Sequence, residues 1–144
     1  MPLLVAVLML VVLVDHALKL LVLRRLGRES ISLGPMGKVT SVQTRIWMAR
    51  APFQLQLAII WTLWIFGACA LAIVNTLVPS SGWFCGLLLG GSLSHALETS
   101  LRGCICDYVC LRFWPAFNIA DVAITMGAVG VAADMLRAVT NAVA

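Results

Sequence analysis

Four long apolar runs dominate the chain and are separated by shorter polar segments. They cover residues 3–23, 57–78, 83–97 and about 117–139. A helix of about 20 apolar residues crosses the roughly 30 Å hydrocarbon layer of a bilayer. The turn between the second and third runs spans only residues 79–82, so the third helix must return antiparallel to the second. The pattern therefore predicts an all-α membrane protein, a bundle of four transmembrane helices in a single integral membrane domain of residues 1–144.

The one long polar segment covers residues 24–50, directly after the first run. Gly34 and Pro35 interrupt it, and residues 40–44 alternate weakly between apolar and polar side chains, as a short strand does. We expect a small extramembrane flap that can contain β-structure and lies on the bilayer. Trp47 and Met48 are predicted to anchor it at the membrane interface.

Composition supports the membrane assignment and narrows the partners. With 62% hydrophobic residues, 11% charged residues and a mean hydropathy of +1.02, the chain has too little polar surface to cover a water-soluble globule. The net charge of +4 comes from basic residues next to apolar runs, so membrane lipids with anionic headgroups are expected partners and nucleic acid is not. Five cysteines, an odd number, argue against a secreted disulfide framework.

The distribution of basic residues predicts one orientation. Six of the ten basic residues lie in segment 24–50, and Arg102 and Arg112 lie between the third and fourth runs. By the positive-inside rule both loops would face the cytoplasm.

Two charged residues fall inside the first apolar run. Asp15 and Lys19 are spaced i, i+4, so they share one helix face and can form a pair. An acid within a membrane span is costly, which favours a role for Asp15. For Lys19, extension of the side chain to the interface beside Arg24 and Arg25 is an equally good interpretation.

Two further acids, Asp107 and Asp121, flank the short loop before the last run. Two carboxylates that approach closely share a proton, so one acts as a base toward water while the other polarises a carbonyl. Each acid also has a simpler interpretation. Asp121 follows Asn118 by three residues, as in a helix cap, and Asp107 alone could be a solvated loop charge.

Ordered motifs decide between these interpretations. They are Asp15-His-Ala-Leu-Lys19, Gly90-Gly91-Ser-Leu-Ser-His95-Ala-Leu-Glu98, Gly103-Cys-Ile-Cys-Asp107-Tyr and Pro115-Ala-Phe-Asn118-Ile-Ala120-Asp121. The chain resembles the prokaryotic lipoprotein signal peptidases, also called signal peptidase II, in all four spans. The resemblance implies a four-helix aspartic endopeptidase that removes signal peptides from diacylglyceryl-modified prolipoproteins, just before the lipid-bearing cysteine.

The same resemblance implies roles for individual residues. Asp107 and Asp121 would be catalytic, and the substrate-binding or supporting residues would be Asn118, Ala120, Asp15, Lys19, Gly91, His95 and Glu98. The expected partner is a lipid-modified prolipoprotein, and no cofactor is expected. The expected location is the prokaryotic cytoplasmic (inner) membrane with the active site toward the outer face. We prefer this orientation to the charge count, because a charge bias is only statistical.

One segment departs from the family pattern. Where the family has Gly-Asn-x-x-Asp-Arg, this chain has Ser94-His95-Ala-Leu-Glu98-Thr99, and Thr99 lacks the five donors of an arginine. Arg102, one turn further on, is a candidate substitute. The change favours an alternative function, a catalytically altered relative that binds lipopeptides or stabilises a membrane complex.

A metal site is a minor alternative. His95, Cys104, Cys106 and Cys110 could supply four ligands, but their spacing matches no common zinc pattern. Thiols near a bilayer are usually small hydrophobes, so no metal is predicted. A regulatory disulfide in this loop is a second minor alternative.

Overall fold

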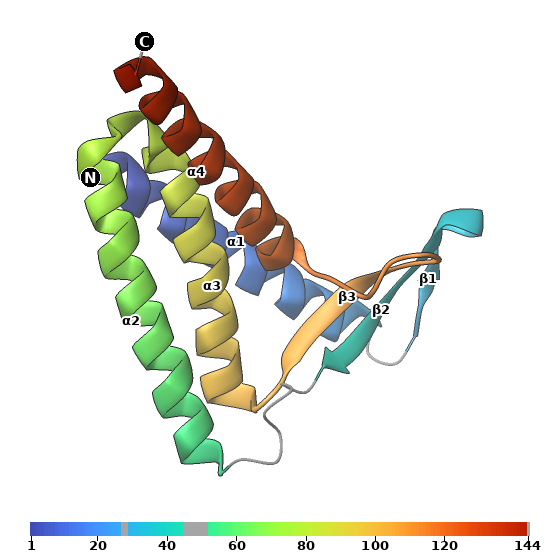
Figure 1. Ribbon diagram of the computed structural model, residues 1–144. Helices are drawn as coiled ribbons and strands as arrows, with labels where there is room; N and C mark the ends of the chain where they lie inside the picture. Colours follow the sequence, from blue (N-terminus) through green and yellow to red (C-terminus); the bar gives the residue numbers. More distant parts are fainter. Residues whose placement is uncertain (27–28, 45–51, 144) are drawn as a thin grey trace.

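The computed structural model describes residues 1–26, 29–44 and 52–143, in which four long helices make up most of the protein (Figure 1). The helices are α1 (Pro2–Leu26), α2 (Phe53–Leu77), α3 (Gly82–Arg102) and α4 (Ile119–Val143). Two short 3-10 turns, η1 (Gly34–Met36) and η2 (Pro79–Ser81), lie between elements. The beginning of α1 and the end of α4 lie at the end of the helices away from the sheet. The four predicted helices are present, and α3 extends five residues beyond its predicted end at residue 97.

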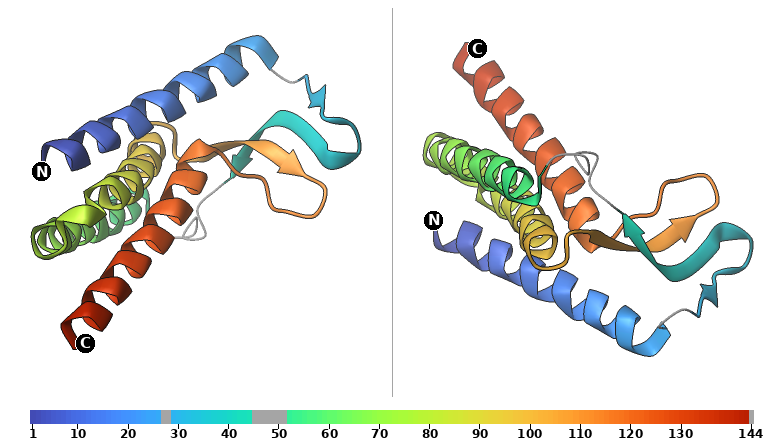
Figure 2. Two further views of the ribbon diagram at one scale, coloured as in Figure 1. Left: turned by 90° about the horizontal axis from the view of Figure 1, so that it is seen from above. Right: turned by 90° about the horizontal axis from the view of Figure 1, so that it is seen from below.

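Three of the four helices, α1, α2 and α4, are long and apolar enough to cross a membrane by length and composition. The third, α3, does not meet that criterion, because its second half carries polar residues that include His95, Glu98 and Thr99. It lies against both α1 and α4, and α2 packs on it as well (Figures 1 and 2). Glu98 and Thr99 of this half are buried against those neighbours. The protein is mostly helical, with three long apolar helices.

Glycines let α3 approach its neighbours closely. A Cβ atom on Gly90 would lie 2.8 Å from the carbonyl oxygen of Leu8 in α1, and one on Gly91 would lie 2.6 Å from the carbonyl oxygen of Ala120 in α4. Small residues at these positions allow two helix backbones to pack in contact. A core cluster of Leu4, Cys85, Leu89 and Val131 fills the space near the beginning of α3.

A three-stranded antiparallel sheet projects sideways from the helices (Figures 1 and 2). Its strands are β1 (Ile31–Ser32), β2 (Gly37–Thr44) and β3 (Ile105–Leu111), in the order β1-β2-β3. The strand predicted at residues 40–44 is confirmed within β2. The rest of the flap prediction, including the anchors Trp47 and Met48, lies partly or wholly outside the described residues.

The prediction of a loop around Asp107 is wrong, because the sheet includes a strand between α3 and α4 besides the β-structure predicted after α1. Asp107 lies in β3, where it pairs in register with Val42 of β2. The segment Ile105–Leu111 is rich in β-branched and aromatic side chains, which suit a strand. Its partner strand lies before α2 in the chain, so local sequence gave no sign of the pairing.

Candidate active site

The start of α4 is closed by a reciprocal pair of hydrogen bonds between Asn118 and Asp121. The backbone N–H of Asp121 donates to Asn118 Oδ1 at 3.2 Å, and the backbone N–H of Asn118 donates to Asp121 Oδ2 at 2.9 Å. This is the geometry of a capping box, which satisfies amide donors that the first helical turn leaves unpaired. The helix-cap interpretation of both residues is confirmed.

The remaining atoms of Asn118 connect this cap to Asp107. Asn118 Nδ2 donates to Asp107 Oδ1 at 2.7 Å and to the backbone oxygen of Cys106 at 3.3 Å. The other carboxylate oxygen of Asp107 accepts a 2.6 Å hydrogen bond from the Thr44 hydroxyl at the end of β2. One fully buried asparagine therefore holds both acids, Asp107 from β3 and Asp121 from α4.

The two acids differ in environment. Asp107 is 6% exposed, whereas the side chain of Asp121 is 38% exposed. Burial raises the pKa of Asp107, and the hydrogen bond from Thr44 offsets part of that rise. The nearby charge of Asp121 raises the pKa of Asp107 further. The solvated-charge interpretation of Asp107 is therefore wrong, and the surroundings favour its protonated form.

The His95 side chain reaches both partners from α3. Its Nε2 atom lies 3.3 Å from Asn118 Oδ1 and 3.6 Å from Asp121 Oδ1. It thus contacts the buried asparagine and the more exposed acid at once.

A buried ion cluster lies between α1 and α3. Lys19 Nζ lies 2.8 Å from Asp15 Oδ2 and 2.7 Å from Glu98 Oε2, and the lysine is 2% exposed. Arg102 Nη1 donates to Glu98 Oε1 at 3.3 Å. The predicted pairing of Asp15 and Lys19 is confirmed, and extension of Lys19 to the interface is wrong. Arg102, the candidate substitute for an arginine at position 99, binds Glu98.

The cluster also contacts the start of α4. Asp15 Oδ1 accepts a 3.3 Å hydrogen bond from the backbone N–H of Ala120, and the Ser94 hydroxyl donates to Asp15 Oδ2. Gly91 packs on the carbonyl oxygen of Ala120. The ion cluster and the small residue therefore position the helical turn that carries Asn118.

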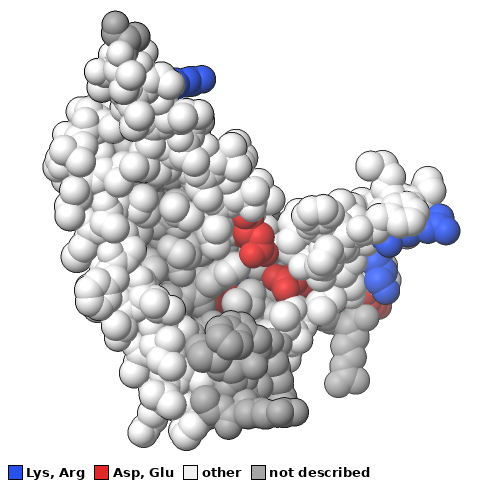
Figure 3. All heavy atoms as spheres, viewed as in Figure 1, with Lys and Arg blue, Asp and Glu red and all other residues white. Residues whose placement is uncertain are grey.

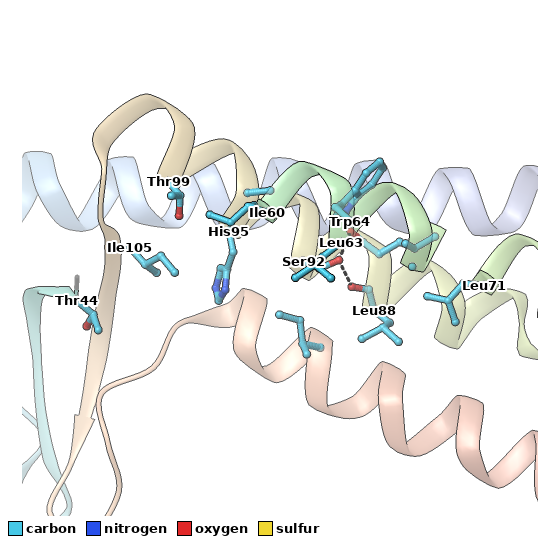
Figure 4. A pocket seen from close by; sticks show the side chains of 14 residues that line it. Thr44, Ile60, Leu63, Trp64, Leu71, Leu88, Ser92, His95, Thr99 and Ile105 are labelled. Atoms are coloured by element: carbon cyan, nitrogen blue, oxygen red, sulfur yellow. Dashed lines mark hydrogen bonds between the residues drawn. The ribbon is translucent and has the colours of Figure 1, made fainter. Parts of the chain in front are cut away.

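An elongated cavity of about 750 Å³ opens beside these groups. Its walls are mostly apolar side chains of α2 and α3, with Ile124 of α4 (Figure 4). Thr44, His95 and Thr99 line its polar end, where the His95 ring points from α3 toward the start of α4. In Figure 3, acidic side chains are visible in the hollow between the helices and the sheet. An apolar ligand in the cavity would therefore lie next to ionisable groups.

Sequence reasoning missed three residues that shape the site. They are Thr44, Ser94 and Tyr108, whose hydroxyl accepts a 3.3 Å hydrogen bond from the backbone N–H of Ile119. Burial raises the pKa of Tyr108 to about 12, so this hydroxyl stays protonated at neutral pH. Their partners lie on other elements, so no local pattern could have identified Thr44 or Tyr108. Periodicity did offer one sign, because Ser94 lies on the same face of its helix as Glu98.

The minor alternatives gain no support in the described parts of the chain. There, no three His, Cys, Asp or Glu side chains gather in a way that could hold a metal ion. The five cysteines are all free thiols.

Comparison with known proteins gives the family. Residues 7–137 match the family described as signal peptidase (SPase) II. The lipoprotein signal peptidase of Xylella fastidiosa (strain 9a5c) is 34% identical over 85 residues, covering 49% of this chain and 51% of that protein. That of Pseudomonas aeruginosa (strain PAO1) is 33% identical over 92 residues, covering 54% of each. The chain thus spans about half the length of the curated relatives it matches.

Solved structures give the fold. A bacterial membrane enzyme determined by the in meso method superposes with a TM-score of 0.75, at 18% identity, over 96% of this chain and 90% of that one. A second such structure gives 0.75 at 19% identity over 92% of each. The family match over residues 7–137 and the three long apolar helices make the chain a membrane protein that belongs to the signal peptidase II family.

Proposed function

We propose that this chain is a membrane-embedded aspartic endopeptidase that removes signal peptides from diacylglyceryl-modified prolipoproteins, with Asp107 and Asp121 as its catalytic pair. One observation carries the proposal: buried Asn118 donates to both carboxylates, which brings two acids from different elements to one site. The family match and the curated relatives, named lipoprotein signal peptidases, support the reaction class.

The chemistry follows from a pair that shares one proton. The ionised carboxylate takes a proton from a water molecule, and the water oxygen attacks the scissile carbonyl carbon. The protonated carboxylic acid gives its proton to the carbonyl oxygen. When the tetrahedral intermediate collapses, the C–N bond breaks and the leaving amine takes up a proton. The two acids titrate together, so their own contribution to the pH dependence of cleavage belongs to the pair and not to either acid.

The surroundings suit a lipid-linked peptide. The apolar cavity offers a place for an apolar peptide segment or acyl chains, and by excluding water it strengthens the electrostatics at its polar end. Asn118 and Ala120 would line the cleavage position. Asp15, Lys19, Gly91 and Glu98 would support it from α1 and α3, through the contacts that position the start of α4.

In this proposal the enzyme lies in the prokaryotic cytoplasmic membrane, with all four helices crossing it and the active site toward the outer face. Glu98, Ser94 and His95 of α3 pair with residues of α1 and α4, so these three side chains would not meet lipid if α3 crossed the bilayer. Membrane lipids would surround the three apolar helices.

The test is prolipoprotein processing in bacteria depleted of their own enzyme. We would express the wild type, Asp107→Asn, Asp121→Asn and a matched control, Asp134→Asn. Asp134 is a buried acid on the same helix as Asp121, but it pairs with Arg137 far along α4. The wild type and the control should convert the precursor to the shorter form, and the two pair variants should not.

Uncut precursor with the wild type would refute the proposal for that substrate. The alternative, a lipopeptide-binding or complex-stabilising relative, would then predict that both pair variants still copurify with the precursor. Cleavage by either pair variant at the wild-type rate would remove that acid from the mechanism.

A further inference from the structure

The hydrogen bonds around Asn118 fix which way its amide points. Nδ2 donates to Asp107 Oδ1 and to the Cys106 carbonyl, and Oδ1 accepts from the backbone N–H of Asp121. An amide oxygen has no proton to donate. His95 Nε2, 3.3 Å from that oxygen, must therefore carry the proton of their hydrogen bond.

This tautomer leaves Nδ1 as the ring nitrogen that gains or loses a proton when the imidazole changes charge. The hydrogen bond from Nε2 is the same in both states, because both carry a proton on Nε2. Protonation of His95 therefore adds a positive charge beside Asp121 Oδ1, 3.6 Å from Nε2, without rearranging the bonds around Asn118.

The charged groups near His95 are either acids that it faces or members of the ion cluster that pair with one another. On α4 and β3 it faces Asp121 and Asp107. Glu98, on its own helix, is paired with Lys19 and Arg102, and Asp15 of α1 is paired with Lys19. The α2 side chains that line the adjoining cavity are apolar except for the indole of Trp64, and Thr44 of β2 is uncharged.

We propose that His95 is a positioning residue of the pair, whose imidazolium keeps the negative charge on Asp121 and so leaves the shared proton on Asp107. The inference rests on the proposed protease function and assigns a role to each acid. Asp121, the more exposed acid, would be the base toward water, and Asp107 would donate to the scissile carbonyl. Burial of Asp107 raises its pKa and acts in the same direction, while the hydrogen bonds from Thr44 and Asn118 and the charge of His95 act against it.

The assignment predicts a pH dependence of cleavage that requires the imidazole. An amide at this position would carry no charge at any pH. Histidine side chains change charge between about pH 5 and pH 8. In the wild type, kcat/KM should fall by about tenfold toward alkaline pH, because a neutral imidazole no longer holds the negative charge on Asp121.

The experiment measures cleavage of a purified diacylglyceryl-modified precursor by detergent-solubilised full-length protein from pH 5 to pH 9. We would compare the wild type with His95→Gln, His95→Asn and His16→Gln. His16 is the chain's other histidine. Its Nδ1 atom lies 3.1 Å from the carbonyl oxygen of Val12 and 3.2 Å from Ser94 Oγ, so its variant controls for loss of a histidine that contacts Ser94 rather than Asn118 or Asp121.

Both His95 variants should be slower than the wild type at pH 6 and lack the fall toward pH 8.5, while His16→Gln should keep it. A wild-type profile in either folded His95 variant would overturn the inference and leave the protease proposal standing. If His95→Gln does not fold, His95→Asn gives the answer alone. If the wild type cleaves nothing, the protease proposal and the inference both fail.

Discussion

Replacement of Lys19 by methionine should strongly destabilise the protein. Methionine has nearly the volume of lysine but no charge, so Asp15 and Glu98 would lose their shared cation at 2.8 and 2.7 Å. Glu98 would keep Arg102, at 3.3 Å. Asp15, with no measurable exposure, would keep only its hydrogen bonds from Ser94 and the backbone of Ala120, so its charge would be buried without a counter-ion.

Removing one partner of a buried ion pair costs about 3–5 kcal/mol. Because Glu98 retains Arg102, we expect the lower end, about 3 kcal/mol for Lys19→Met. For a chain of this size, about 3 kcal/mol corresponds to a fall in melting temperature of roughly 10 °C. The assay is thermal unfolding in one detergent, followed by intrinsic tryptophan fluorescence.

The chain's other lysine, Lys38, offers a matched control, because it lies exposed on β2. Lys38→Met should melt within about 2 °C of the wild type. Addition of Asp15→Asn to Lys19→Met should restore part of the loss, since the buried charge is then gone. A Lys19→Met protein that melts at the wild-type temperature would refute the argument. So would a double variant that melts at a lower temperature than Lys19→Met.

Three further predictions concern packing and the pair. Gly91→Ala should cost about 1–3 kcal/mol of stability and lower activity, because its Cβ would lie 2.6 Å from the backbone oxygen of Ala120. Gly67→Ala is the control: a Cβ there would meet nothing within 4 Å, so this variant should melt at or above the wild-type temperature. The raised pKa of Asp107 means that the folded state favours the neutral form of this side chain. The stability that Asp107 contributes is therefore present at acid pH and is lost as pH rises through the raised pKa. Asp107→Asn should therefore melt above the wild type at pH 8 while cleaving nothing, and a lower melting temperature there would contradict the raised pKa. Asn118→Ala should reduce cleavage at least 100-fold, because it removes the side-chain hydrogen bonds that connect Asn118 to both acids. More than a tenth of wild-type activity in a precursor cleavage assay would contradict this.

Much of the site was readable from sequence because its parts follow local rules. The i, i+4 spacing of Asp15 and Lys19 predicted their pairing, and the i, i+3 spacing of Asn118 and Asp121 predicted a helix cap. Both depend only on the geometry of one helix. The apolar runs likewise predicted four helices, since hydropathy along the chain is a local property.

The remainder depends on contacts between distant segments. Strand β3 forms because β2, from before α2, lies beside it, and that pairing brings Thr44 to Asp107. Lys19 is buried because α3 presents Glu98 to it, which turns a side chain that could have reached the interface into the centre of an ion cluster. Sequence alone thus determined the four helices and the cap of α4, and it singled out Asp107 and Asp121 as candidates. Only the tertiary structure decided that Asn118 joins those acids and that His95 stands beside them, because hydrogen bonds between elements depend on how the helices and the sheet pack.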